Sequence, residues 1–138
     1  GLTLHHKHIP EMQKVCALEK SPVFLPVVDD YYKGMATTIM LHNALLPGAP
    51  TAAQICEKLQ EYYSGQHFVT VMPFGENAST IYAAELAGTN HLKIVVCGHE
   101  DQTSVTALFD NLGKGASGAA IQNMNILLSV DETTGLNL

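Results

Sequence analysis

The glycine-rich stretch DNLGKGASGAAIQNMN, residues 110–125, is the feature that most constrains the fold of this chain. Asp110 and Asn111 are of the residue types that cap helix starts, and apolar residues recur at helical spacing from Ala116 onward. The stretch is therefore expected to be a loop that turns into a helix. Its apolar side would comprise Ala120, Met124, Leu127 and Leu128. A separate polar stripe would comprise Gly118, Gln122 and Asn125.

The first turn of this expected helix is unusually rich in glycine, with Gly113, Gly115 and Gly118 close together. Glycine inside a helix costs about 1 kcal/mol relative to alanine, so the cluster requires a reason. Another group could approach the backbone closely, or the free N–H groups with Lys114 beside them could hold an anion. Tight packing of a small-residue helix against a neighbour is a third explanation, and composition alone leaves all three open.

The same string resembles the C-terminal signature of N-acetyl-γ-glutamyl-phosphate reductases, and a similar DNLxKGAA string occurs in the related aspartate-semialdehyde dehydrogenases. In both families this helix runs from the catalytic domain back towards the nucleotide-binding domain, and its start lies near the nicotinamide. The resemblance implies that Asn111 and Gly115 contact an NADP cofactor and that Lys114 assists by its charge.

Two histidines near the N-terminus form the second informative pattern. The alternation over residues 2–9 predicts a strand. One face of that strand would carry Leu2, Leu4, His6 and His8. Pro10 and Glu11 suit the first turn of a helix that follows. The buried side of that helix is expected to comprise Met12, Val15, Cys16 and Leu18.

His6 and His8 have three possible roles on chemistry alone. They could be hydrogen-bonded side chains at a strand end, or they could bind zinc with Glu11 as a third ligand. No fourth ligand has a suggestive spacing, so no metal site is expected. Acid–base catalysis is the third role, because histidine titrates near neutrality and can move a proton in both directions.

The segment HKHIPEM, residues 6–12, resembles the HRHxPE(I) segment of the N-acetyl-γ-glutamyl-phosphate reductases. Aspartate-semialdehyde dehydrogenases carry a different histidine segment, so this stretch favours the reductases. The resemblance implies that His8, with His6 as the second choice, is the acid–base partner of a catalytic cysteine. Glu11 is predicted to contact the substrate.

Residues 22–34 resemble the FxPHLxPxxRG region of the same reductases, ahead of a strand expected over residues 33–42. Phe24, Pro26, Gly34 and Thr38 match the family pattern. The family's histidine, second proline and arginine are replaced by Val27, Asp30 and Lys33. Lysine cannot hold a carboxylate or phosphate in the two-pronged way that arginine does. Lys33 is thus predicted to be a weaker substrate contact, and a solvated turn lysine is the alternative.

The remaining chain predicts an α+β domain. Thr51–Gln54 is a capping box that starts a helix, and strands are expected over residues 68–72, 92–97 and 103–109. The string Gly88-Thr89-Asn90 matches a recurring (G)TN of the family, where Asn90 is expected to stabilise a turn. This order predicts a mixed, mainly antiparallel sheet with helices on one face and the other face free to pair. The resemblance implies the glyceraldehyde-phosphate-dehydrogenase-like C-terminal domain, whose sheet serves oligomer contacts.

Composition narrows the class of partner. Charged residues make up only 14% of the 138 residues and the net charge is −6, against about 25% charged residues in an average domain. Part of the surface is therefore expected to be hidden against a partner, and nucleic acid is disfavoured. No apolar run approaches the ~20 residues of a membrane span. Three cysteines without a CxxC pair suit a reducing, cytoplasmic setting.

Two motifs of the complete reductases do not occur in this sequence. None of the three cysteines lies in the family's GCxPT-like context, and no GxGxxG turn follows a strand. We therefore expect residues 1–138 to be a catalytic and dimerisation domain fragment, with the NADP-binding domain absent and no turnover in isolation. The expected partners are an acyl phosphate or semialdehyde substrate, the missing nucleotide-binding domain and further copies of the chain.

The resemblance implies one reaction for the whole enzyme. A cysteine thiolate attacks N-acetyl-γ-glutamyl phosphate, and NADPH reduces the resulting thioester to the semialdehyde, in arginine biosynthesis. An aspartate-semialdehyde-dehydrogenase-like enzyme and a non-catalytic, self-associating homologue are the alternatives.

Overall fold

The computed structural model describes residues 3–76 and 80–138, and the chain divides into two compact units. The N-terminal unit spans Gly1–Asp30, and the C-terminal unit spans Tyr31–Leu138.

Among its described residues the N-terminal unit contains one helix, α1 (Ile9–Val15), which begins with a proline in its first turn as predicted. The strand expected over residues 2–9 is wrong for residues 3–8, which form turns and irregular backbone; residue 2 lies outside the described residues. Leu4 has a φ of 54°, and the Ile9 N–H donates to the His6 carbonyl at 3.1 Å. The backbone therefore bonds locally and turns into α1, instead of extending as a strand.

The apolar side predicted for α1 is exposed. The helix contains no buried residue, and Val15 and Leu18 are 78% and 41% exposed. The prediction of a buried side was wrong because a seven-residue helix in so short a unit has too little apolar surface around it to form a core.

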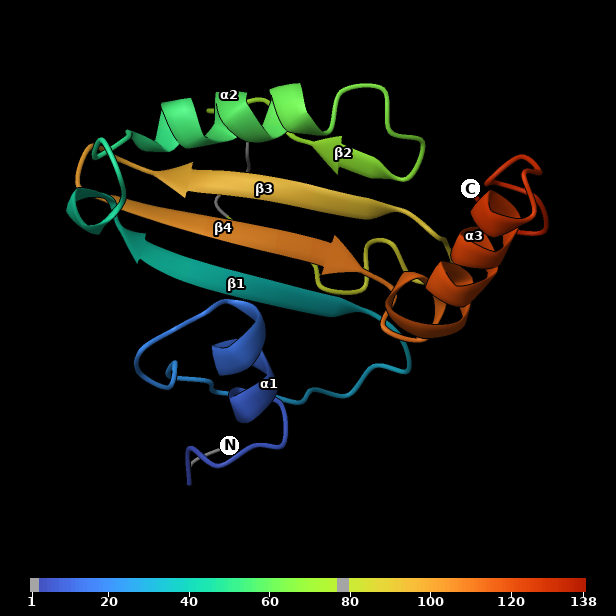
Figure 1. The fold of residues 1–138 in the computed structure, drawn as a ribbon, viewed down its shortest axis with the longest axis horizontal. Coiled ribbons are helices and arrows are strands. Elements are labelled where there is room, and N and C mark those ends of the chain that lie inside the picture. Colours follow the sequence, from blue (N-terminus) through green and yellow to red (C-terminus); the bar gives the residue numbers. More distant parts are fainter. Residues whose placement is uncertain (1–2, 77–79) are drawn as a thin grey trace. The chain divides into compact units, whose positions relative to one another are not determined.

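Within the described residues of the C-terminal unit, four strands form one sheet (Figure 1). They are β1 (Met35–His42), β2 (Val69–Val71), β3 (Leu92–Gly98) and β4 (Gln102–Phe109), in the order β1-β4-β3-β2. β4 pairs antiparallel with both β1 and β3, whereas β2 pairs parallel with β3. The predicted α+β class with a mixed, mainly antiparallel sheet is confirmed.

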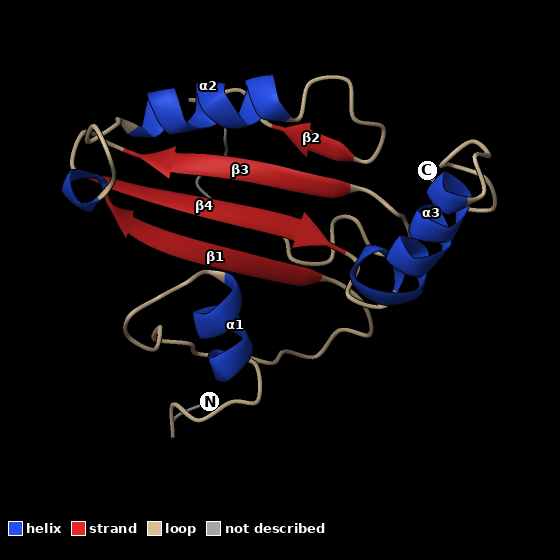
Figure 2. Cartoon of the chain, in the orientation of Figure 1, coloured by secondary structure: helices blue, strands red, loops and turns tan. Residues whose placement is uncertain are grey.

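Helix α2 (Ala52–Tyr62) starts at the predicted capping box. The Gln54 N–H donates to Thr51 Oγ1 at 3.3 Å, and the Thr51 N–H donates to Gln54 Oε1 at 2.9 Å. The helix lies along one face of the sheet (Figure 2), where Cys56 packs in the core with Ile94 and Val96. The packing of α2 holds in place the sheet that carries the candidate site.

The opposite face of the sheet is partly covered by the turn segment 83–88. A Cβ at Gly34, just before β1, would lie 2.6 Å from the Ala83 carbonyl oxygen, so only glycine fits there. Val95 and Leu108 point to this face and are 5% and 1% exposed. The expectation that this face is free to pair is therefore wrong at this end of the sheet.

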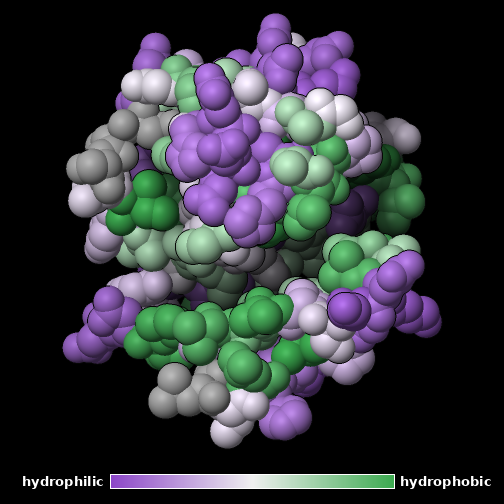
Figure 3. Space-filling view, turned by 90° about the vertical axis from the view of Figure 1, so that its left-hand side faces the viewer, coloured by the Kyte–Doolittle hydropathy of each residue, from purple (hydrophilic) through white to green (hydrophobic). Residues whose placement is uncertain are grey.

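Apolar side chains remain exposed on the edge strand β1, where Ile39 and Met40 are 57% and 84% exposed. Figure 3 shows hydrophobic residues at the surface beside hydrophilic ones. No helix among the described residues is long and apolar enough to cross a membrane.

We expect Ile94→Ala to lower the free energy of unfolding by about 2–5 kcal/mol, because it leaves a cavity between α2 and the sheet. Ile126→Ala, at a position 55% exposed on the last helix, is the matched control and should change it by less than about 0.5 kcal/mol. Urea unfolding followed by circular dichroism measures both values. Equal effects of the two substitutions would contradict the assigned core.

Candidate functional site

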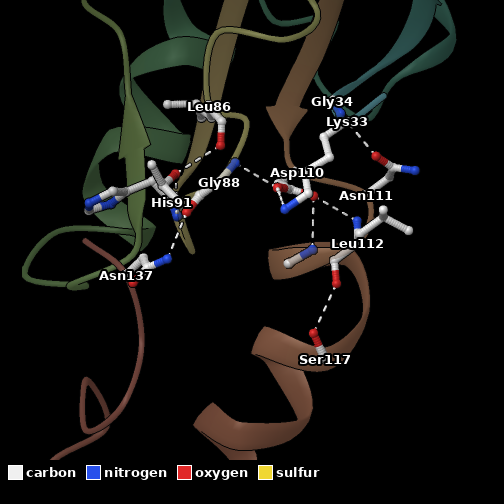
Figure 4. Close-up of polar contacts among 12 residues, drawn as sticks. Lys33, Gly34, Leu86, Gly88, His91, Asp110, Asn111, Leu112, Ser117 and Asn137 are labelled. Atoms are coloured by element: carbon white, nitrogen blue, oxygen red, sulfur yellow. Dashed lines mark hydrogen bonds and ion pairs between the residues drawn. The ribbon is translucent and has the colours of Figure 1, made fainter. Parts of the chain in front are cut away.

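The buried carboxylate of Asp110 organises the end of the sheet. Asp110 follows β4 directly and is 0% exposed. Its Oδ1 accepts hydrogen bonds from the Leu112 and Gly113 N–H groups at 2.8 and 2.9 Å, and its Oδ2 accepts one from the Gly88 N–H at 2.7 Å (Figure 4). One side chain thus ties the loop that leads to the last helix to the turn segment 83–88. The helix cap predicted for Asp110 and Asn111 is not formed as such, because the residues before the two helical segments, Leu112 and Ser117, have no side-chain cap and Asn111 accepts the Gly34 N–H instead.

Asp110 stays ionised in this setting. Burial alone would raise the pKa of Asp110, but the N–H donors of Gly88, Gly113 and Leu112 outweigh it and lower the pKa below its usual value. The Lys33 ammonium acts in the same direction, with its Nζ 4.0 Å from Asp110 Oδ2. Anion binding by free N–H groups was one of the three explanations left open for the glycine cluster, and the anion that the Leu112 and Gly113 N–H groups hold is the protein's own carboxylate.

The glycine-rich turn has a packing reason as well. A π-helical turn over Gly113–Ser117 leads into α3 (Gly118–Leu127), close to the predicted start at Ala116. The Gly115 N–H donates to the Asp110 carbonyl at 2.8 Å, and a Cβ at Gly115 would lie 3.0 Å from the Phe109 ring. Gly115 thus allows the turn to pack closely on the end of β4.

The buried side of α3 is the polar stripe, and the predicted apolar side is wrong. Met124 and Leu127 are 51% and 84% exposed, whereas Asn125 is 4% exposed. Asn125 Nδ2 donates to the carbonyls of Glu132 and Thr134 at 3.2 and 2.9 Å. The helix turns its polar side inward because the segment after it, residues 131–138, folds back and supplies these carbonyl partners.

The three residues predicted to contact a cofactor lie on this loop and differ in their surroundings. Asn111 Oδ1 accepts the Gly34 N–H at 2.9 Å, and its Nδ2 has no partner among the described residues. Lys114 Nζ donates to Gln122 Oε1 at 2.5 Å and lies 5.1 Å from the centre of the Phe68 ring. These contacts turn the Lys114 ammonium toward the C-terminal unit, and desolvation lowers the pKa of Lys114, with Glu132 opposing.

A pocket of about 390 Å³ opens beside the Asp110 turn. Its walls include Lys33, Asn90, Gly113, Gly118 and Asn137. Lys33, predicted to contact substrate, has a side chain 39% exposed. Asn90 is the residue that sequence reasoning missed, because its GTN string indicated only a turn. Asn90 is 2% exposed, and neither of its side-chain polar atoms has a hydrogen-bond partner within residues 3–76 and 80–138.

The N-terminal unit brings together the predicted acid–base residues. His8 Nδ1 lies 2.9 Å from Glu11 Oε2, and the His8 N–H donates to His6 Nδ1 at 3.3 Å. The His6 ring packs against Phe24, with ring centres 4.9 Å apart. Within the part of the chain that the structure describes, no three His, Cys, Asp or Glu side chains are grouped to hold a metal ion.

Comparison of the sequence with known protein families assigns the chain to one of them. Residues 1–111 match the family described as semialdehyde dehydrogenase, dimerisation domain, and this chain belongs to that family. The family predicted from the sequence motifs is confirmed.

The individual relatives are more specific. The chain is 46% identical over 132 residues to proteins named N-acetyl-gamma-glutamyl-phosphate reductase from Brucella ovis, Brucella melitensis biotype 2 and Brucella suis biovar 1. Each match covers 93% of this chain and 43% of the relative. The chain thus spans less than half the length of the curated relatives it matches.

We expect Asp110→Asn to lower the free energy of unfolding at pH 7 by about 1.5–3 kcal/mol, because it removes a charge that accepts three N–H bonds. The folded-state pKa of Asp110 is lowered, so its contribution is fully present above the unfolded pKa of about 3.9 and is lost as pH falls through the folded pKa. The difference between the variant and the wild type should therefore shrink below about pH 4. Urea unfolding from pH 7 to pH 3 measures it, with the exposed Asp101→Asn as control. A difference independent of pH would contradict the assigned charge.

We expect Gly118→Ala to destabilise the protein by about 1–3 kcal/mol, although alanine is the better helix former. Its Cβ would collide with Asn90 Oδ1 and lie 2.9 Å from the Gly113 carbonyl oxygen. The double variant with Asn90→Ala should recover part of the loss, as a non-additive effect in thermal unfolding. Asn123→Ala, on the exposed side of α3, controls for helix propensity. A stabilising Gly118→Ala would show that the contact is absent.

Proposed function

We propose that this chain is the catalytic and dimerisation part of an NADPH-dependent N-acetyl-γ-glutamyl-phosphate reductase. The observation that carries the proposal is the 46% identity to proteins of that name over 93% of the chain. The His8–Glu11 pair in the HKHIPEM segment supports it, because the pair supplies an oriented histidine for acid–base work.

The proposed reaction has two stages. In the whole protein a cysteine outside this chain attacks the acyl phosphate, which forms a thioester and releases phosphate. When bound, NADPH would supply the hydride for reduction of the thioester to N-acetylglutamate semialdehyde, and the cysteine would leave as the thiolate.

His8 would transfer protons in this reaction. Its Nδ1 is engaged with Glu11, which leaves Nε2 for the reacting sulfur or oxygen atom. Glu11, predicted from the sequence to contact substrate, fits a positioning role through this hydrogen bond. His6 lies beside His8 and is the second candidate for the proton transfer.

The residues present fit a nicotinamide cofactor in part. Asn111 is held through its Oδ1 by the Gly34 N–H, and its Nδ2 is left to donate a hydrogen bond. Among the three predicted residues, Asn111 is therefore the one whose surroundings suit contact with a nicotinamide. Gly115 would allow the same turn to pack closely, and Lys114 would place a positive charge on it. Each of the two residues already has partners inside the C-terminal unit.

Self-association fits the proposed assembly. The chain belongs to a dimerisation-domain family, and the edge strand β1 exposes Ile39 and Met40. Exposed apolar side chains on an edge strand are the kind of surface that a second copy can cover.

We expect the full-length protein to oxidise N-acetylglutamate semialdehyde in the presence of phosphate and NADP, and to prefer it to aspartate semialdehyde. His8→Asn should lower kcat by about 10²–10⁴-fold, because general acid–base catalysis contributes that much. Steady-state formation of NADPH measures both effects.

His5→Asn is the matched control, because His5 is an exposed histidine of the same segment, and it should retain activity. Full activity in His8→Asn would move the proton transfer to His6. Preference for aspartate semialdehyde would favour the related dehydrogenase, and no turnover with either aldehyde would favour a non-catalytic homologue.

A further inference from the structure

The side chain of Asn90 is an unusual group to bury. It is 2% exposed, and both Oδ1 and Nδ2 lack a hydrogen-bond partner among the described residues. Most buried polar side chains in proteins are paired, so an unpaired amide requires an explanation. Asn90 lines the pocket beside the Asp110 turn, which indicates where its partner would bind.

The turn that contains Asn90 does not depend on its side chain. The Asn90 N–H donates to the Asn137 carbonyl at 2.8 Å, which is a backbone interaction. Thr89 Oγ1 donates to the Leu86 carbonyl at 3.0 Å and accepts the His91 N–H at 3.3 Å. The Thr89 hydroxyl therefore stabilises the turn, and the role expected for Asn90 from the sequence is already filled.

The fold also reserves space for this amide. Gly118, the first residue of α3, is buried, and a Cβ there would collide with Asn90 Oδ1. A small apolar side chain at position 90 would have no unpaired polar atoms, and it would leave room for a Cβ at position 118. The side chain that exists instead buries a donor and an acceptor without partners among the described residues, at a residue that lines the pocket.

Lys33 supplies a positive charge to the same pocket. Its side chain is 39% exposed, and its Nζ lies 4.0 Å from Asp110 Oδ2. A separation of 4.0 Å is longer than a hydrogen bond, so the three N–H donors of the Lys33 ammonium remain available to an anion in the pocket. The pocket thus offers a cation together with an amide that can donate and accept.

We propose that this pocket binds the N-acylamino-acid part of the substrate, with Asn90 pairing with its amide group and Lys33 with its α-carboxylate. Asn90 Nδ2 would donate to the acetamido oxygen, and Asn90 Oδ1 would accept the acetamido N–H. The inference rests on the proposed function, because the relatives' name supplies the N-acetyl group. A nicotinamide carboxamide could also pair with Asn90, but the nicotinamide ring carries no carboxylate that could pair with Lys33.

The test is calorimetric titration of the full-length protein with N-acetyl-L-glutamate and with L-glutamate, which lacks the amide. Asn90→Ala should weaken binding of N-acetyl-L-glutamate about tenfold or more and leave L-glutamate binding unchanged. Its thermal midpoint should stay the same or rise, because an unpaired buried amide is removed. Asn123→Ala, on the exposed side of α3, is the matched control and should change neither affinity.

Lys33→Gln is a second variant that keeps the inference testable if Asn90→Ala does not fold. It should weaken both ligands by a similar factor, because both carry the α-carboxylate. Unchanged N-acetyl-L-glutamate affinity in Asn90→Ala, or no binding of this ligand to the wild type, would overturn the inference. A loss of NADP affinity alone in Asn90→Ala would reassign the amide to the cofactor.

The two proposals fail in different ways. Turnover of N-acetylglutamate semialdehyde by the wild type, with affinity unchanged in Asn90→Ala, retains the function and rejects the role of Asn90. Binding that depends on Asn90 in a protein without turnover retains the pocket and rejects the function.

Discussion

The candidate site depends on one buried carboxylate. Asp110 accepts N–H groups from the turn segment 83–88 and from the loop that precedes α3, so both are held at the end of β4. Because these donors keep it ionised, the charge near Lys33 is a fixed part of the pocket. The glycines of the loop are explained by the close packing that this arrangement requires.

Local signals in the sequence predicted much of the fold. The capping box at Thr51 marks the start of α2, and the alternation that precedes Asp110 marks β4. The sequence singled out Asp110 for its local bonds to the next residues, which do form, but not for its bond to the distant Gly88 N–H. The family also followed from contiguous motifs, which sequence alone displays in full.

The errors arise where distant segments decide the outcome. The segment of residues 3–8, expected to be a strand, forms turns and irregular backbone, because it pairs with no strand among the described residues and the Ile9 N–H bonds back to the His6 carbonyl. The inner side of α3 is polar because residues 131–138 supply carbonyl groups to Asn125, which no helical periodicity can reveal. Asn90 was missed for the same reason. Its side chain lacks a hydrogen-bond partner among the described residues because of where the fold buries it, and its neighbours in the sequence do not reveal that.

The wide separation of the bonded residues has a consequence for folding. The Gly34–Asn111 bond closes 77 positions and the Gly88–Asn137 bond closes 49, whereas the β3–β4 hairpin joins adjacent segments. Long loops cost more entropy to close, so non-local contacts form slowly. The hairpin can therefore assemble early, and the pocket is completed only when the chain has nearly finished folding. Ligand-binding competence should then appear after most of the secondary structure during refolding.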